Sequence, residues 1–189
     1  MADYIAHHGV KGMKWGIRRF QNKDGTRTPA GKKRENMVAK RVTTKKGHEM
    51  LIKQNEASIV ARILSKHSAK IRSTVERSFS YTLLNVDKKK VGEMELFTES
   101  KDELNGTWLG VNKKERGKGY AEAALKEAII YAKDNGYKKF TLEVPGNSPD
   151  ARHIYEKNGF KVTKTITDSD DVVWGGLTAM ELDLRKDQK

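Results

Sequence analysis

A run of two glycines and two basic residues, Arg116-Gly117-Lys118-Gly119-Tyr120-Ala121, constrains this chain more than any other stretch. It follows an apolar, strand-like run and precedes an alanine-rich segment with helical spacing. Glycine at a strand-to-helix turn lets backbone N–H groups approach a ligand that a Cβ atom would hold off. The helix that follows directs the positive end of its dipole into the same space, which stabilises a phosphate. The sequence therefore predicts a pyrophosphate-binding turn.

Apolar periodicity before and after this turn predicts the secondary structure. Phe79, Tyr81 and Leu83 alternate with polar residues, as in a half-buried strand. Further strands are predicted at 91–98, 107–111, 140–144, 160–166 and 177–184, and helices at 55–67, 121–134 and 149–158. Ser148-Pro149 predicts the start of the last helix, with a capping hydroxyl and a proline at the first helical position. One strand–helix–strand unit among hairpin-linked strands predicts an α/β (α+β) fold, with a mixed, mostly antiparallel sheet and flanking helices.

The charge of the chain is concentrated near its N-terminus. Residues 1–70 carry 17 Lys and Arg against 5 Asp and Glu, whereas residues 71–189 carry 21 against 20. This contrast predicts a basic N-terminal arm at 1–35, a helical linker at 36–70 and a nearly neutral globular domain at 71–189. The chain contains no cysteine, which removes disulfides and a thiolate nucleophile. No apolar run reaches the roughly 20 residues of a membrane span, so we expect a cytoplasmic protein without a membrane partner.

Three phosphate-bearing ligands compete for the glycine turn. A Walker loop requires Gly-Lys followed by Ser or Thr, and the sequence does not match it. A dinucleotide fingerprint requires a third glycine where this chain has Glu122, although Glu143 lies at the spacing of a ribose-binding carboxylate. The third candidate is acetyl-coenzyme A.

The run from Trp108 to Phe160 resembles the GNAT family of acyl-CoA-dependent N-acetyltransferases. Arg116 to Ala121 matches that family's Arg/Gln-x-x-Gly-x-Gly/Ala loop at each fixed position. The second half of the family pattern is matched at its usual spacing by Leu142-Glu143-Val144, Asn147, Ala151, Tyr155-Glu156-Lys157 and Asn158-Gly159-Phe160. The resemblance implies a GNAT-like sheet with a central strand–loop–helix cofactor site, and acetyl-CoA as the acetyl donor.

The resemblance also implies which residues bind acetyl-CoA. The pyrophosphate would contact the backbone of the turn, formed by Arg116, Gly117, Lys118, Gly119, Tyr120 and Ala121. The pantetheine arm would pair with backbone near Leu109 and Val111, in the manner of an added strand. Asn147 would bind the cofactor from the end of the next strand, although Asn-Ser-Pro is also good helix-cap chemistry.

Two catalytic residues are expected from the same resemblance and from the chemistry. Tyr155 would protonate the departing thiolate, with packing of its ring against the sheet as the alternative. The general base that deprotonates the amine is less specified by the sequence. Glu95 is our candidate, and Glu93, Glu103 and His153 are alternatives; a solvated outer face is the ordinary explanation for a charged strand residue. We expect no metal site, because the adjacent His7 and His8 have no carboxylate or cysteine at ligand spacing.

The N-terminal arm carries a distinctive run of interleaved basic and aromatic residues, from His7 to Phe20. Such a run could bind a nucleic acid by charge and stacking, or it could be a solvated tail. The segment also resembles one found at the N-terminus of bacteriophage and prophage structural proteins, which implies a phage-encoded and virion-associated protein. The sequence therefore supports two hypotheses: an N-acetyltransferase that acts on a primary amine, or a non-catalytic GNAT-fold protein docked to a phage particle through its arm.

Overall fold

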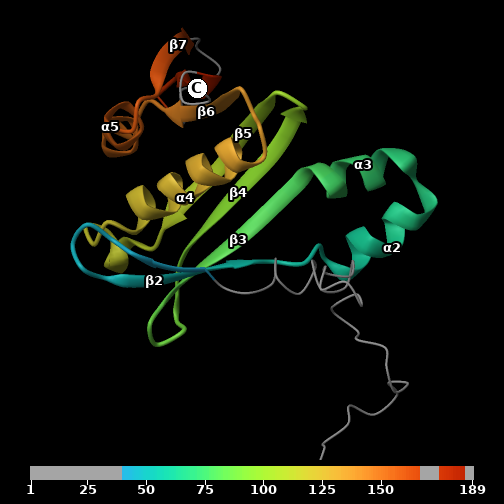
Figure 1. Cartoon of the computed structure of the whole chain (residues 1–189), viewed down its shortest axis with the longest axis horizontal. Coiled ribbons are helices and arrows are strands. Elements are labelled where there is room, and N and C mark those ends of the chain that lie inside the picture. Colours follow the sequence, from blue (N-terminus) through green and yellow to red (C-terminus); the bar gives the residue numbers. More distant parts are fainter. Residues whose placement is uncertain (1–39, 167–174, 186–189) are drawn as a thin grey trace, which may run out of the picture. The chain divides into compact units, whose positions relative to one another are not determined.

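The computed structural model describes residues 40–166 and 175–185, which all belong to one unit, Ala39–Lys189 (Figure 1). The strands are β1 (Lys40–Thr43), β2 (Glu49–Gln54), β3 (Ser78–Asn85), β4 (Lys90–Ser100), β5 (Glu103–Val111), β6 (Lys139–Pro145), β7 (Lys161–Ile166) and β8 (Leu177–Asp183). The helices are α2 (Ile59–His67), α3 (Ala69–Arg77), α4 (Tyr120–Asp134) and α5 (Pro149–Lys157), with a short 3-10 turn, η1 (Lys113–Glu115).

The described strands form one mixed sheet in the order β1-β2-β3-β4-β5-β6-β8-β7. All neighbouring pairs are antiparallel except β5 and β6, which are parallel and are joined through α4. A parallel pair requires such a crossover, whereas antiparallel strands can be joined by a turn or, as for β6 and β8, by a segment that contains another strand. The predicted fold class, a mixed and mostly antiparallel α/β sheet with flanking helices, is therefore confirmed.

Within the helical linker predicted at 36–70, the described residues 40–54 are not helical. The segment from Lys40 to Gln54 forms the β1–β2 hairpin, which pairs with β3 and extends the sheet. Only the second half of the segment is helical, and there α2 agrees with the predicted helix at 55–67. The reason is that Met50 and Ile52 alternate with exposed residues and are buried in the core, which is a strand period.

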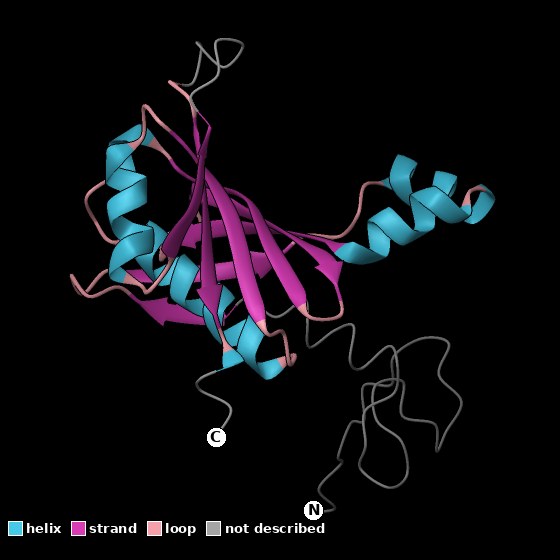
Figure 2. Ribbon diagram, turned by 90° about the horizontal axis from the view of Figure 1, so that it is seen from above, coloured by secondary structure: helices cyan, strands magenta, loops and turns pink. Residues whose placement is uncertain are grey.

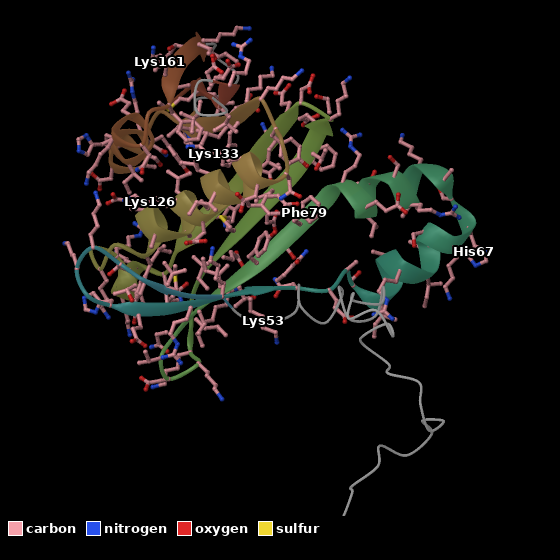
Figure 3. All side chains as sticks on the ribbon, in the orientation of Figure 1. Lys53, His67, Phe79, Lys126, Lys133 and Lys161 are labelled. Atoms are coloured by element: carbon pink, nitrogen blue, oxygen red, sulfur yellow. The ribbon has the colours of Figure 1, made fainter. Side chains whose placement is uncertain are left out.

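Helix α4 packs against one face of the sheet through small residues, among them Ala124, Ala128 and Ala132 (Figure 2). On the strand side, Phe79 faces this helix, and its ring meets the ring of Tyr131 edge-on with centroids 5.8 Å apart (Figure 3). The helix ends at Asp134, the end that the sequence predicted; Asn135 is its C-cap, and Gly136 follows with φ of +76°. The short alanine side chains let the helix lie close to the strands.

Helices α2 and α3 form a hairpin between β2 and β3. Ser58 and Ser68 cap the two helices, because each hydroxyl accepts a hydrogen bond from a backbone N–H three residues later. Neither helix has a buried residue, and α3 makes the closer contacts with the sheet, at β3 and β4. Within the described residues, no helix is both long and apolar enough to cross a membrane.

Helix α5 begins at Pro149, as predicted, but the predicted capping hydroxyl is wrong. The Ser148 side chain makes no capping hydrogen bond, and its hydroxyl lies 3.3 Å from Asn147 Oδ1 instead. The backbone of Ser148 has ψ of 60°, outside the usual extended geometry of a capping residue, which turns the hydroxyl away from the helix amides.

Candidate active site

The glycine turn between β5 and α4 has the geometry that its sequence predicts. Gly117 and Gly119 both have left-handed backbones, with φ of +79° and +86°. Gly119 is the N-cap of α4, so the amides that follow it belong to the first helical turn, which lacks intrahelical acceptors. A Cβ atom built on Gly117 meets no atom within 4 Å. Space, free amides and a helix N-terminus therefore coincide at this turn.

The turn of the β1–β2 hairpin packs on the glycine turn, although β1 and β2 lie at the edge of the sheet and are separated from β5 by β3 and β4. Lys46 Nζ donates a hydrogen bond of 2.6 Å to the carbonyl oxygen of Gly117. Thr44 is buried, and its Cβ lies 3.2 Å from the position that a Cβ on Gly119 would occupy. The rings of His48 and Tyr120 lie 6.1 Å apart. The hairpin thus holds the turn in place and adds a lysine beside it. The prediction of a helical linker for this segment did not include such a role.

Glu122, in the first turn of α4, is surrounded by lysines. Its carboxylate pairs with Lys45, Lys126 and Lys157, at 3.0, 3.4 and 3.4 Å. The hydrogen bond from Lys45, followed by those from the other two lysines, lowers the pKa of Glu122 to about 2 although burial opposes the shift. A negative charge at this position also complements the helix dipole. Glu122 therefore ties the hairpin and α5 to the start of α4, and it stands where a dinucleotide site would require glycine.

Strands β5 and β6 separate just where the sheet approaches the glycine turn. They pair in register from Glu103 with Lys139 to Gly106 with Leu142, and then β5 continues to Val111 without β6. The separation coincides with a bulge: Glu95 pairs with Trp108 and Leu96 with Gly106, so Thr107 is the extra residue of β5. A bulge bends a strand and increases its twist, which turns the end of β5 away from β6.

The freed edge of β5 presents the backbone groups of Leu109 and Val111. The N–H of Asn112 donates to Val91 O across β4, at 2.8 Å. Because backbone groups alternate in direction along a strand, the amides of Leu109 and Val111 point to the opposite edge, toward the gap. Arg116 Nε, at 3.3 Å from the carbonyl oxygen of Val111, also lies on that side. These are the two residues that the sequence analysis selected for pantetheine pairing.

Gly110 does not produce the separation of the strands. A Cβ at Gly110 would lie 2.8 Å from Trp108 Nε1, so the missing side chain makes room for the indole ring. Gly92, on β4, faces the same position, because its Cβ would lie 2.3 Å from the carbonyl oxygen of Gly110. The two glycines permit close approach of β4 and β5. The bulge that opens the sheet is at Thr107.

Tyr155 is connected to the point where β5 and β6 separate through two aromatic rings, those of Phe160 and Phe140. Its ring meets Phe160 edge-on at 5.7 Å, and Phe160 meets Phe140 edge-on at 5.4 Å. Phe140 in turn fills the space in front of Gly106, where an added Cβ would lie 3.1 Å from the ring. Burial raises the pKa of the Tyr155 hydroxyl, which keeps it protonated at neutral pH. Both the packing role and the proton-donor role considered for this residue are compatible with this position.

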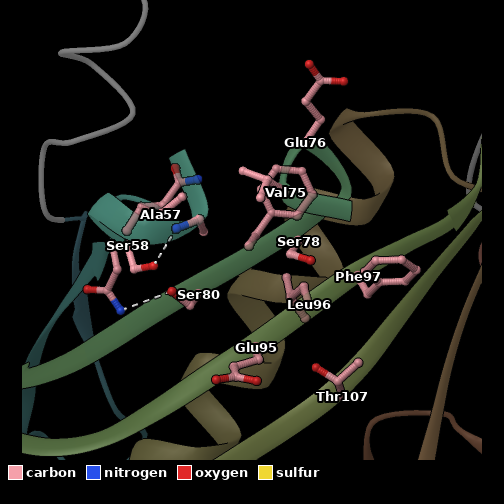
Figure 4. A pocket seen from close by; sticks show the side chains of 14 residues that line it. Ala57, Ser58, Val75, Glu76, Ser78, Ser80, Glu95, Leu96, Phe97 and Thr107 are labelled. Atoms are coloured by element: carbon pink, nitrogen blue, oxygen red, sulfur yellow. Dashed lines mark hydrogen bonds between the residues drawn. The ribbon is translucent and has the colours of Figure 1, made fainter. Parts of the chain in front are cut away.

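Glu95 faces a pocket on the sheet surface opposite α4. The pocket has a volume of about 460 Å³ and lies between the α2–α3 hairpin and strands β3, β4 and β5 (Figure 4). Glu95 and Thr107 lie at its strand side, and Ser58 and Ala61 at the α2 side. The pocket thus contains both the candidate base and the bulge residue that opens the sheet.

The other candidate bases have different surroundings. Glu93 pairs with Lys90 at 2.6 Å, and Glu103 pairs with Lys139 at 2.9 Å. His153 is exposed on α5, and Asn147 is exposed in the turn before that helix. None of the three alternative bases lines the pocket, and neither does Asn147, the predicted cofactor contact, whereas Glu95 does. Within the described residues no group of His, Asp and Glu side chains is arranged to hold a metal ion.

The mixed sheet opens between two parallel strands, with a glycine turn at the start of the helix that joins them, as the resemblance to acyl-CoA-dependent N-acetyltransferases implies. Residues 77–162 match the family model described as an acetyltransferase (GNAT) domain. Residues 1–22 match a family of unknown function. The resemblance of the N-terminal arm to phage proteins concerns residues outside the described part of the chain.

The uncharacterized N-acetyltransferase YycN of Bacillus subtilis (strain 168) is 36% identical over 58 residues, which are 31% of this chain and 37% of that protein. Among solved structures, the IAA acetyltransferase from Bacillus cereus ATCC 14579 has a TM-score of 0.56 at 19% identity, over 71% of this chain and 99% of that one. A GNAT family acetyltransferase from Elizabethkingia anophelis with acetyl-CoA bound also has a TM-score of 0.56, at 17% identity, over 71% and 97% of the two chains. These structures establish the fold.

The residues of this chain fit acetyl-CoA. The space before Gly117 admits a phosphate group that a Cβ would obstruct, and the first turn of α4 offers backbone donors to it. The freed edge of β5 offers donors and acceptors to the amides of a pantetheine arm. Lys46, from the β1–β2 hairpin, adds positive charge next to the turn. Acetyl-CoA is the donor used by this class of domain, and it is bound in the related structure.

Proposed function

We propose that the chain transfers the acetyl group of acetyl-CoA to a primary amine. The observation that carries this proposal is the coincidence of three features within one GNAT domain: the left-handed glycine turn, the start of α4 and the separation of β5 from β6. The pyrophosphate would lie on Arg116, Gly117, Lys118, Gly119, Tyr120 and Ala121, and the pantetheine arm along Leu109 and Val111. Asn147 would contact the cofactor from the end of β6.

Acetyl-CoA supplies an acyl group activated as a thioester. In the proposed reaction the amine nitrogen forms a bond to the carbonyl carbon, and the carbon–sulfur bond breaks. Glu95 takes a proton from the ammonium so that the nitrogen has a free electron pair, and Tyr155 gives its proton to the departing thiolate. The nitrogen loses its second proton once it is bonded to the carbonyl carbon, and this proton restores the Tyr155 hydroxyl. The N–H of Val111 points toward the gap, where it can stabilise negative charge on the carbonyl oxygen. The raised pKa of Tyr155 suits a proton donor.

The substitution Tyr155→Phe tests this assignment. It keeps the ring that packs on Phe160 and removes the hydroxyl, so we expect kcat to fall about 100-fold with little change in the acetyl-CoA Kd. The matched control is Tyr131→Phe, because Tyr131 is another part-buried tyrosine with a raised pKa, and its ring packs against Phe79 on β3. The measurement is thiol release with a panel of amines and peptides, together with calorimetric titration of acetyl-CoA.

The same assay separates the two hypotheses from the sequence. Saturable acetyl-CoA binding without thiol release on any amine would favour the non-catalytic GNAT-fold protein, and absence of binding would refute the cofactor assignment. Equal kcat values for Tyr155→Phe and the native protein would remove Tyr155 from the mechanism. For residues 1–35, docking to a phage particle or a nucleic acid stays a prediction, supported by the basic charge of this segment. Cytoplasmic location and virion association also stay predictions.

A further inference from the structure

Helix α2 exposes a continuous apolar surface. Ile59, Val60, Ile63 and Leu64, which we call the α2 stripe, are 72%, 65%, 52% and 46% exposed. These positions recur at the spacing of one helix face, the arrangement that ordinarily packs against a core. In this chain α2 instead packs mainly on α3, at the hairpin whose tip carries His67 (Figure 3). Four large apolar side chains gathered on one exposed helix face indicate an interaction surface.

The α2 stripe begins at the edge of the pocket that holds Glu95. Ser58, the N-cap of α2, lines that pocket (Figure 4), and Ala61 in the first turn of α2 lines it as well. Ala61 lies one residue from Val60 and one helical turn from Leu64, so the apolar side chains continue from the pocket wall to the outer surface. A molecule with one end in the pocket can therefore extend along α2.

The pocket offers one carboxylate to a cation. Of the residues that line it, only Glu95 and Glu76 are charged, and Figure 4 shows the Glu76 side chain extending away from Glu95. The remaining polar groups are neutral, including Asn55, Ser80 and Thr107. Outside the pocket, α2 carries Lys66 and Arg62, of which Arg62 pairs with Glu56 at 2.8 Å, and α2 itself has no acidic residue that could bind a second ammonium group. The described lining thus suits a single amine followed by an apolar segment, and it does not suit a polyamine.

We propose that the acceptor is a lysine side chain of a protein segment, which places its amine beside Glu95 and packs neighbouring apolar residues on the α2 stripe. This inference rests on the proposed acetyltransferase function for its chemistry, but the docking surface can be tested without turnover. The negative charge of Glu95 favours an amine in the pocket. Because the pocket is continuous with the α2 stripe, an extended and partly apolar acceptor is favoured over a small one.

The test compares two nine-residue peptides with a central lysine, one flanked by leucines and the other by serines. We expect kcat/KM with acetyl-CoA to be at least about 10-fold higher for the leucine peptide, since one buried methylene group is worth several-fold in binding. The double substitution Val60→Ser and Leu64→Ser should bring this ratio close to one. The control is Val86→Ser, because Val86 is 61% exposed in the turn between β3 and β4 and lies outside the pocket.

Direct binding of the two peptides, labelled with a fluorophore and measured by anisotropy in the presence of CoA, distinguishes the possible failures. Stripe-dependent binding of the leucine peptide without thiol release would uphold the docking surface and contradict the proposed function. Three outcomes would overturn the inference: equal binding and turnover of both peptides, spermidine turned over faster than either, or a stripe substitution that only converts a dimer into a monomer in sedimentation.

Discussion

The left-handed turn at Gly117 allows backbone strain to be separated from ligand contact. Gly117 and Gly136 have nearly the same backbone, with φ of +79° and +76°, and a Cβ added to either meets no atom within 4 Å. Gly117 lies at the N-terminal side of α4 and Gly136 just beyond its C-terminus. An alanine at either position must adopt the left-handed conformation, at a cost of roughly 1–2 kcal/mol.

We therefore expect Gly117→Ala and Gly136→Ala to lower the free energy of unfolding equally. Alanine also restricts the unfolded chain, which offsets part of this cost. The free energy of unfolding should therefore fall by about 1 kcal/mol, and Tm by about 2–4 °C. Only Gly117→Ala should weaken acetyl-CoA binding, by at least about 10-fold, or ~1.4 kcal/mol, because its methyl group occupies the space for the pyrophosphate. Thermal denaturation gives the first quantity and calorimetric titration the second. Native affinity in Gly117→Ala would refute the placement of the pyrophosphate.

Two further predictions concern the residues around the turn. The pKa of Glu122 is about 2 in the folded chain and ordinary when unfolded, so its ion pairs stabilise the fold above about pH 5 and lose this effect as the pH falls toward 2. Between pH 7 and pH 3, the free energy of unfolding measured with urea should fall by about 1–2 kcal/mol less for Glu122→Gln than for the native chain, after allowance for the exposed lysine partners. An equal fall in both proteins would contradict this. Lys46→Met should weaken acetyl-CoA binding about 3- to 10-fold at low salt and less at high salt, because the lysine lies beside the turn. Lys53→Met, on the same hairpin but outside these contacts, serves as its control, and an equal effect of both substitutions would show that the turn does not depend on Lys46.

Local signals in the sequence were sufficient for much of the sheet. Alternation at Phe79, Tyr81 and Leu83 identified β3, and apolar periodicity identified the helix at 121–134 that joins β5 to β6. The same approach assigned residues 40–54 to a helical linker, because β1 is short and almost wholly exposed. Its strand conformation depends on pairing with β2, and β2 depends on β3, whose paired residues lie about 30 positions away in the chain.

The residues of the candidate site also divide into those that a local sequence pattern indicates and those that depend on pairing between strands. Leu109, Val111 and the glycine turn could be proposed from the sequence, because the family resemblance that implies them rests on a short, continuous motif. The residue that opens the sheet could not, since a bulge at Thr107 is defined only by the register between β4 and β5. Gly110, on the same strand, has a different role, because its missing side chain makes room for the indole ring of Trp108.

The sequence by itself determined the left-handed turn at Gly117 and Gly119, since only glycine adopts such backbones without strain, and with it the expectation of a bound pyrophosphate. The tertiary structure alone decided what surrounds that turn. Lys46 reaches Gly117 across 71 residues of sequence, and Glu122 collects lysines from three separate segments. Backbone conformation is set by a residue and its neighbours, whereas contacts of this length exist only after the sheet has brought distant strands together.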